Sequence, residues 1–444
     1  MTPSNLEQLL DAHPDIANVD AVFVDLDGHL RGKRLPREKA AEAIRNGVMI
    51  PQAIMALTTP GECLDAGGRG ISDGDPDGVG AAVAGSAVRL PWSDRTAQVL
   101  LRMNAFDGEP LGCDPRNVLD GVVARLAALG LRPVMAFELE FYVIAQQRAA
   151  DGGPLLPAQI AAIPAGARSH GTPVLDALAP FFQTVEAFAD AMDIRIGGVT
   201  TETGLGQFEI NLHHGDQPGR AADEVILLRQ ILWNAARANG LDVTFMAKPF
   251  ADQPGDGLHL HLSLIDGEGR NIFGLDDGDE RLRHAIGGIR DLMPAAMALQ
   301  APNLNSFRRF VPGSFAPINR TWGRDNRSVA FRIPMSKPEA RRIEHRIAGG
   351  DANPYLVAAS VLASVIHGLE NRIDPGASST GNANLIQDDA VPTDVLAALD
   401  LLTGSAEMRR HLGSDYVDLY ADIRRKELRR LLGTHLPKEY EWYL

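Results

Sequence analysis

Four separated segments of the chain alternate between apolar residues and residues that bind metals or anions. They are MAFELEFYV, GQFEINLHH, LHLHLSL and RRIEHRI, which begin at residues 135, 206, 258 and 341. A period of two is typical of a β-strand, whose successive side chains point to opposite faces. Each segment therefore predicts a strand with one apolar and one polar face. The polar faces constrain the fold strongly, because they hold glutamate, histidine and arginine but no lysine.

Paired glutamates on one strand face predict a bound cation. Glu138 and Glu140 stand two residues apart, so they share a face and repel each other unless a positive group lies between them. Mg²⁺ and Mn²⁺ prefer carboxylate oxygen with an occasional histidine, and the other strands supply Glu209, His259 and His261. The strands together predict a metal site lined by sheet faces. A histidine pair in an apolar strand, taken alone, also fits a structural pair or a solvated face.

A stretch rich in arginine separates the third and fourth of these strands. It holds six arginines within 25 positions, although the chain as a whole is acidic. These are Arg308, Arg309, Arg320, Arg324, Arg327 and Arg332. The arginine fork binds both phosphate and carboxylate, so a metal site with arginines indicates phosphoryl transfer. A basic surface loop is the alternative interpretation, and the absence of GxxxxGKS or GxxxxGKT excludes a P-loop.

Length and charge limit the class of protein. The chain has 444 residues, of which 45% are hydrophobic and 23% charged, as in a globular protein large enough for two domains. Its formal net charge of −14 argues against a nucleic-acid partner, because such binding neutralises phosphates with Lys and Arg. The longest apolar run, residues 356–366, is too short to cross a membrane. With no signal-like N-terminus and only two distant cysteines, Cys63 and Cys113, we expect a soluble cytoplasmic protein without membrane contact.

Local signals divide the chain near residue 108. Residues 5–13 predict a helix, and residues 21–36 predict two strands joined by a hairpin turn at Asp27-Gly28. From about residue 107 helices alternate with the polar-faced strands, which indicates a domain boundary there. Residues 356–366 predict a buried core helix, and residues 393–432 predict further helices.

These motifs, in this order, resemble those of the glutamine synthetase superfamily. The likeness runs over nearly the whole chain and covers DLDGHLRGKR, GDPDG, FELEFY, ETGLGQFEINL, GLHLHLSL, NSFRRFVPG, NRSVAFRIP and RRIEHRIAGGDANPY. The resemblance implies an α+β fold, with a small N-terminal β-grasp domain over residues 1–108. A catalytic domain over residues 109–444 would then hold a mainly antiparallel, funnel-shaped sheet flanked by helices. The family also implies a homo-oligomer, a dodecamer of two stacked hexameric rings with each funnel shared between neighbouring subunits.

The resemblance implies two Mg²⁺ or Mn²⁺ ions in each active site, with ATP as the co-substrate. The positions that match the ligands of the ion nearer glutamate are Glu140, Glu202 and Glu209. The positions that match the ligands of the ion nearer the nucleotide phosphates are Glu138, His259 and Glu344.

The family also implies the residues that bind the two substrates. The positions that match nucleotide-binding residues are His261, Ser263, Arg332 and Arg342. The positions that match glutamate-binding residues are Gly255, Arg309 and Arg346. Arg327 matches the residue that stabilises the transferring phosphate, so Arg327 and Arg309 are the residues expected to act in catalysis.

Two departures from ammonia-using glutamine synthetases concern the nitrogen acceptor. Those enzymes carry a glutamate two residues after the glycine of VPG, in a flap that shields the intermediate and deprotonates ammonium, and Phe315 stands there in this chain. They also carry an Asp-Gly-Ser-Ser motif, whereas residues 47–61 here are largely apolar, and the first carboxylate after them is Glu62. An aromatic side chain packs on alkyl carbon but takes no proton. We therefore expect Phe315 to contact an organic amine, as in γ-glutamylpolyamine and γ-glutamylmonoamine synthetases.

The resulting hypothesis is ATP-dependent joining of the glutamate γ-carboxylate to a small amine through γ-glutamyl phosphate. A polyamine needs a carboxylate for its distal ammonium, and no such residue is identified, so a monoamine fits the apolar flap slightly better. The alternatives are an ammonia-using glutamine synthetase and a non-catalytic family member. Against the latter, all six metal-ligand positions hold competent residues.

Overall fold

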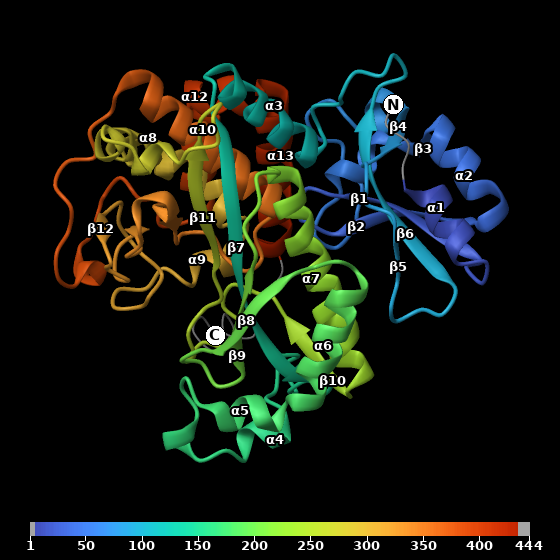
Figure 1. The fold of residues 1–444 in the computed structure, drawn as a ribbon, viewed down its shortest axis with the longest axis horizontal. Helices are drawn as coiled ribbons and strands as arrows, with labels where there is room; N and C mark the ends of the chain where they lie inside the picture. Colours follow the sequence, from blue (N-terminus) through green and yellow to red (C-terminus); the bar gives the residue numbers. More distant parts are fainter. Residues whose placement is uncertain (1–4, 434–444) are drawn as a thin grey trace.

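The computed structural model describes residues 5–433 and contains two β-sheets with helices around them (Figure 1). The first sheet has six strands in the order β2-β1-β6-β4-β3, with β5 paired to β6. Its strands are β1 (Asn18–Val24), β2 (Leu30–Pro36), β3 (Val48–Pro51), β4 (Asp77–Ala82), β5 (Val88–Arg89) and β6 (Thr96–Asn104). Paired strands are antiparallel except β1 and β6, which run parallel. Helices α1 (Leu6–Ala12) and α2 (Arg37–Asn46) pack beside this sheet.

The helix and the hairpin predicted near the N-terminus are confirmed. Strands β1 and β2 pair in register from Asn18 opposite Pro36 to Val24 opposite Leu30. The turn between them contains Gly28 with a φ of 81°, a left-handed conformation that favours glycine. The Asp25 carboxylate closes this turn by accepting the amide of Asp27 at 2.9 Å.

The second sheet has eight strands in the order β12-β13-β14-β11-β7-β9-β8, with β10 paired to β7. Its strands are β7 (Arg132–Ala145), β8 (Ile196–Thr201), β9 (Gln207–Leu212), β10 (Leu241–Thr244), β11 (Leu258–Ile265), β12 (Trp322–Arg324), β13 (Phe331–Ile333) and β14 (Ile343–His345). Paired strands are antiparallel except β12 and β13. The four polar-faced strands predicted from the sequence are β9, β7, β11 and β14, and they are consecutive neighbours in the sheet.

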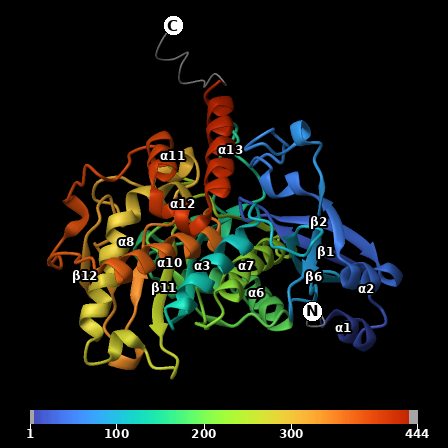
Figure 2. The same ribbon diagram turned by 90° about the horizontal axis from the view of Figure 1, so that it is seen from above.

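Helices behind this sheet bury its apolar face. The helix α10 (Pro354–Asn371) lies beside α8 (Gly278–Gln300), α3 (Pro115–Ala128) and α7 (Pro218–Ala238), as Figure 2 shows. Every residue of α10 from Pro354 to Ile366 is buried, so the prediction of a core helix there is confirmed. The predicted C-terminal helices are α11 (Val395–Gly404), α12 (Ala406–Leu412) and α13 (Ser414–Leu432).

Shorter helices complete the described part of the chain. The α-helices are α4 (Ala158–Ala161), α5 (Thr172–Ala177), α6 (Ala179–Ala191) and α9 (Leu304–Phe307). The 3-10 helices are η1 (Gln52–Ala56), η2 (Ile71–Asp73), η3 (Ala165–Ala167), η4 (Ile272–Gly274), η5 (Pro338–Ala340) and η6 (Ala383–Leu385). None of the helices between residues 5 and 433 is long and apolar enough to span a membrane.

The hairpin turn of the first sheet docks onto the helices of the second. The Asn353 side chain caps α10 and also donates to the carbonyl oxygen of Asp25 at 2.9 Å. Asp27 pairs with Arg424 of α13. One continuous apolar core joins both sheets. The fold is therefore a mixed α and β fold, and the division at residues 108 and 109, which falls between β6 and α3, stays a prediction.

Candidate active site

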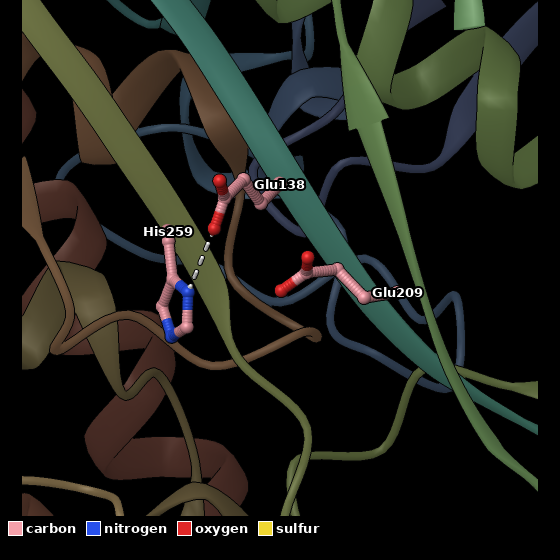
Figure 3. A group of neighbouring side chains, drawn as sticks. All are labelled: Glu138, Glu209 and His259. Atoms are coloured by element: carbon pink, nitrogen blue, oxygen red, sulfur yellow. Dashed lines mark hydrogen bonds and ion pairs between the residues drawn. The ribbon is translucent and has the colours of Figure 1, made fainter. Parts of the chain in front are cut away.

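Strand register brings the predicted metal ligands together on one face of the second sheet. His259 of β11 stands opposite Glu138 of β7, and Glu140 of β7 stands opposite Glu209 of β9. Figure 3 shows Glu138, Glu209 and His259 pointing toward one another from these three adjacent strands. The apolar residues between them face the opposite way and are buried against the helices, as the alternation predicted.

Two overlapping groups of side chains have ligand atoms close enough to hold a cation. The first is Glu138, Glu209 and His259, and the second is Glu138, His261 and Glu344, each with ligand atoms within 4.8 Å of one another. Glu138 joins the groups, since its carboxylate contacts His261 Nε2 at 2.7 Å and His259 Nδ1 at 3.3 Å. The nucleotide-binding role that the resemblance implies for His261 stays a prediction, and in the structure its imidazole contacts Glu138.

Glu140 and Glu202 lie beside the first group. A carboxylate oxygen of Glu140 is 3.8 Å from His259 Nε2, and its other oxygen accepts the amide of Gly257 at 2.6 Å. Burial and the charges of Glu140 and Glu209 raise the pKa of Glu202 to about 7. Neither Glu140 nor Glu202 belongs to the two groups with ligand atoms within 4.8 Å, so their grouping with Glu209 around one ion stays a prediction.

The carboxylates of the site fall into two electrostatic classes. Burial and the charge of Glu138 raise the pKa of Glu209 to about 7. Burial also opposes ionisation of Glu344, but Arg346, His259 and His261 lower its pKa to about 2. Hydrogen bonds from the two histidines similarly outweigh burial and hold the pKa of Glu138 well below its ordinary value. The β9 side of the site therefore carries uncompensated negative charge, while the β14 side is neutralised by protein cations.

This donor set fits hard divalent cations. It offers carboxylate oxygens and imidazole nitrogens without thiolate, which is the ligand chemistry of Mg²⁺ and Mn²⁺. A cation beside Glu202 and Glu209 would offset the burial and repulsion that raise the pKa of these two carboxyls. The residues present therefore fit the metal ions that the sequence predicts.

Three of the predicted arginines surround the second group. Arg332 Nη1 donates to Glu344 at 2.7 Å and its Nη2 donates to Asp325 at 2.7 Å. Arg346 donates to the other oxygen of Glu344, and Arg342 Nε donates to His261 Nδ1 at 3.0 Å. These arginines line the strands with their charges directed at the ligand set, where they can also meet an anionic substrate.

The buried side chain of Arg309 packs against Gly255, next to the candidate metal ligands. Arg309 is only 4% exposed, and its Nη1 donates to the carbonyl oxygen of Ile347 at 2.9 Å. A Cβ on Gly255 would lie 2.5 Å from Arg309 Cγ, so a larger residue could not stand there. Gln207 holds this segment by donating to the carbonyl oxygen of Gly255 at 3.1 Å.

Within residues 5–433, no hydrogen bond or ion pair joins the other predicted residues to the candidate metal ligands. Ser263 continues the polar face of β11 and is half-buried. Phe315 is 62% exposed in the loop after α9, and Arg327 is exposed in the loop between β12 and β13. Of the remaining arginines, Arg320 pairs with Asp388 and Arg324 pairs with Asp279. These two arginines therefore pair with carboxylates outside the ligand set.

Sequence reasoning missed two aspartates behind Arg309, one buried and one half-buried. Asp256 is fully buried and accepts Gln207 Nε2 at 3.0 Å. Asp351 accepts hydrogen bonds from Asn303 and Ser306. Neither aspartate lies in a strand of period two, and their partners are distant in sequence. The only available signal is that Asp351 belongs to the motif GGDANPY, to which no role was attached.

A cavity of about 950 Å³ lies apart from the ligand set. It runs between the hairpin turn of the first sheet, α7 and the end of α13, and none of the predicted site residues lines it. Cavity size therefore does not identify the reaction centre, whereas the concentration of carboxylate, histidine and arginine does.

This sheet face combines candidate ligands for a divalent cation with arginines, the combination that phosphoryl transfer uses. The glutamine synthetase catalytic-domain family matches residues 112–443. The chain belongs to the glutamine synthetase family.

Relatives within that family include enzymes for different nitrogen acceptors. The γ-glutamylputrescine synthetase PuuA of Escherichia coli is 34% identical over 99% of this chain and 94% of that protein. A glutamine synthetase of Pyrococcus abyssi is 31% identical over 96% of this chain and 95% of that protein. A glutamate–isopropylamine ligase of Pseudomonas is 30% identical over 97% of this chain and 96% of that protein. The solved structure of a GmaS–ADP complex has the same fold, with a TM-score of 0.85, 23% identity and 99% coverage of both chains.

Proposed function

We propose that this chain is an ATP-dependent ligase that joins the γ-carboxylate of glutamate to a small organic amine. The observation that carries this proposal is the set of carboxylates, histidines and arginines on β9, β7, β11 and β14, together with Phe315 in the loop beyond α9. The ligand set supports ATP chemistry in a family of glutamate ligases, and the aromatic side chain supports an acceptor with alkyl carbon.

The first step is attack by a γ-carboxylate oxygen of glutamate on the γ-phosphorus of ATP. ADP leaves and γ-glutamyl phosphate forms. Arg309 and Arg346, next to Gly255, would bind the glutamate carboxylates, while Arg332, Arg342, His261 and Ser263 would face the nucleotide. Two Mg²⁺ or Mn²⁺ ions held by Glu138, Glu140, Glu202, Glu209, His259 and Glu344 would neutralise phosphate charge when bound. Arg327 would swing from its exposed loop to the transferring phosphate.

The second step is attack by the neutral amine nitrogen on the carbonyl carbon of the acyl phosphate. The bond to phosphate breaks, inorganic phosphate leaves, and the nitrogen loses a proton as the amide forms. Phe315 cannot accept that proton, so it would pack on the alkyl group and exclude water from the acyl phosphate. The departing phosphate can take up that proton, so the step balances as the amide and hydrogen phosphate.

The assembly and location are part of the same proposal. The predicted family assembly is a dodecamer of two stacked hexameric rings with each funnel shared between neighbouring N-terminal β-grasp and catalytic domains. ATP and glutamate are intracellular metabolites, so the ligase would work in the cytoplasm. Size-exclusion chromatography with light scattering tests the assembly, and a monomer with full activity would contradict it.

An acceptor panel tests the reaction. Phosphate release is measured with ATP, Mg²⁺ and glutamate, and with putrescine, isopropylamine or ammonium chloride as the acceptor. We expect at least one amine to exceed ammonia by about tenfold or more in kcat/KM, which corresponds to about 1.4 kcal/mol of transition-state binding. Ammonia outperforming every amine would overturn the proposal in favour of a glutamine synthetase, the alternative that the Pyrococcus relative represents.

A matched pair of variants tests the role of the loop. Phe315→Glu restores a carboxylate in the flap and should raise the use of ammonia relative to the best amine. Leu129→Glu is the control, because Leu129 is 43% exposed and caps α3, one of the helices behind the sheet. Equal ratios of ammonia to amine activity in both variants would remove Phe315 from acceptor selection.

A further inference from the structure

Asp351 lies where the chain passes from β14 to α10, directly behind the arginine-bearing turn. Its Oδ2 accepts two hydrogen bonds, from Ser306 Oγ at 2.7 Å and from Asn303 Nδ2 at 2.8 Å. Its Oδ1 is buried and has no partner among the described residues. Burying Oδ1 without a donor is costly, so the structural contribution of Asp351 comes from the two hydrogen bonds that its Oδ2 accepts.

The two donors belong to a capping box that builds the single turn α9. Asn303 Oδ1 accepts the amide of Ser306 at 3.1 Å, and Ser306 Oγ accepts the amide of Asn303 at 3.3 Å. The amide of Arg309 donates to the carbonyl oxygen of Ser306 at 3.2 Å, so a hydrogen bond fixes the backbone of Arg309 to this turn. Asp351 thereby fixes the base of the Arg309 side chain.

The segment around Asp351 also fixes the tip of the same arginine. Arg309 Nη1 donates to the carbonyl oxygen of Ile347, four residues before Asp351. Arg229 holds that segment from the other side by donating to the carbonyl oxygens of Gly350 at 2.7 Å and Ala352 at 2.8 Å. The segment 347–351 therefore fixes both the guanidinium of Arg309, through Ile347, and its backbone, through Asp351 and the α9 cap.

The flap that carries Phe315 begins at the same point. Ser314 Oγ donates to the carbonyl oxygen of Arg309 at 3.2 Å, and the Val311 amide donates to that oxygen at 2.9 Å. A shift of α9 would therefore move the glutamate-binding arginine and the root of the flap together.

We propose that Asp351 is a positioning residue, which sets Arg309 for the glutamate carboxylate by anchoring the Asn303–Ser306 cap. The proposal rests on the proposed function, because it takes Arg309 as a glutamate-binding residue. Asp351 does not touch substrate; it acts through Ser306, Asn303 and the backbone of Arg309.

Alanine and asparagine at position 351 separate positioning from mere stability. Asp351→Ala removes both acceptors and should raise the KM for glutamate about tenfold or more, since small misplacements of binding groups cost that much, while the KM for ATP changes less than about twofold. Asp351→Asn keeps one oxygen that can accept both donors, so it should restore most of the glutamate affinity. Ser306→Ala removes one of the two hydrogen bonds and should give a smaller rise, again selective for glutamate.

Asp114→Ala is the matched control. Asp114 is buried at the start of α3 and, like Asp351, accepts two hydrogen bonds. Its donors are the backbone amides of Met103 and Arg116. Its loss should lower the melting temperature without changing the ratio of the KM for glutamate to the KM for ATP.

The outcomes are distinguishable. No glutamate-dependent phosphate release from the wild-type protein would overturn the proposed function. An active wild type with an Asp351→Ala variant that raises both KM values equally, or that Asp351→Asn fails to rescue, would overturn only the role of Asp351. If Asp351→Ala does not fold, Ser306→Ala decides, and an unchanged KM for glutamate in that variant overturns the proposal.

Discussion

Replacing Glu209 by glutamine should stabilise the metal-free protein while removing a metal ligand. The Glu209 carboxyl has a pKa of about 7 in the folded chain, against an ordinary value of 4.5, because of burial and the charge of Glu138. The folded state therefore binds this proton more tightly than the unfolded state. The free energy of unfolding falls as the pH rises from about 4.5 to about 7, and the loss is complete above pH 7. Glutamine escapes this loss, and its amide oxygen can still accept Asn211 Nδ2, which lies 2.9 Å from Glu209 Oε1.

The magnitude follows from the pKa difference. Ionisation of Glu209 at pH 8 costs the folded state at most about 3 kcal/mol, from a pKa of about 7 against 4.5. Unfolding entropy of about 2.1 cal/mol/K per residue gives about 0.9 kcal/mol per degree for 444 residues. The melting temperature of Glu209→Gln in EDTA at pH 8 should therefore exceed that of the wild type by up to about 3 °C. The difference should vanish near pH 5.

Glu344→Gln is the control with the opposite sign. Arg346, His259 and His261 hold the pKa of Glu344 at about 2 despite burial, so its ionised form stabilises the fold above pH 4.5 and that contribution is lost as the pH falls through about 2. Its replacement leaves Arg346 without its carboxylate and should lower the melting temperature at pH 8 by a similar amount. Differential scanning fluorimetry with and without Mn²⁺ measures both variants. A shift in the same direction for both would refute the electrostatic division of the site.

Three further outcomes are expected. Mn²⁺ affinity should rise with pH up to about 7 and then level off, because the Glu202 and Glu209 carboxyls must lose protons before they bind the ion. Calorimetry in buffers of different ionisation enthalpy should detect this proton release below pH 7. Asn353→Ala removes the cap of α10 and the link to the first sheet, and should cost about 1–2 kcal/mol in a denaturant titration. Asp223→Asn breaks a buried pair with Arg116 and should cost about 3–5 kcal/mol in the same titration without altering Mn²⁺ binding.

The strand content of the site was predictable because alternation is a local property. Each strand with a period of two declares its two faces within a few residues, so β7, β9, β11 and β14 and their ligands could be read from the sequence. The order of the strands and their register are set by long-range pairing. That His259 stands opposite Glu138, and His261 opposite Glu344, depends on pairing between segments far apart in the chain. Alternation therefore predicted the polar strand faces, whereas a grouping of the ligands came from the family resemblance alone, and the groups in the structure share Glu138.

Asp351 marks the limit of the sequence argument. Its partners Asn303 and Ser306 precede it by 48 and 45 residues, and none of the three belongs to a periodic pattern. A hydrogen-bonded cap that supports a functional arginine has no local signature, because Asn, Ser and Asp are common in any loop. Residues that position a binding residue are thus harder to predict than the binding residue itself. A change in either Asp351 or Arg309 should nevertheless weaken the binding of glutamate.

The distribution of positive charge orders the metal sites. Glu344 already receives two arginines, and Glu138 already receives two histidines, so a cation entering that group competes with partners the protein supplies. Glu202 and Glu209 have no arginine partner, and burial, followed by the charges of neighbouring glutamates, raises the pKa of both, which a divalent ion would oppose. The gain on binding is therefore greatest on the β9 side, and the first equivalent of Mn²⁺ should go there. Calorimetry should then show Glu209→Gln losing the tighter of two binding events, while Glu344→Gln loses the weaker one.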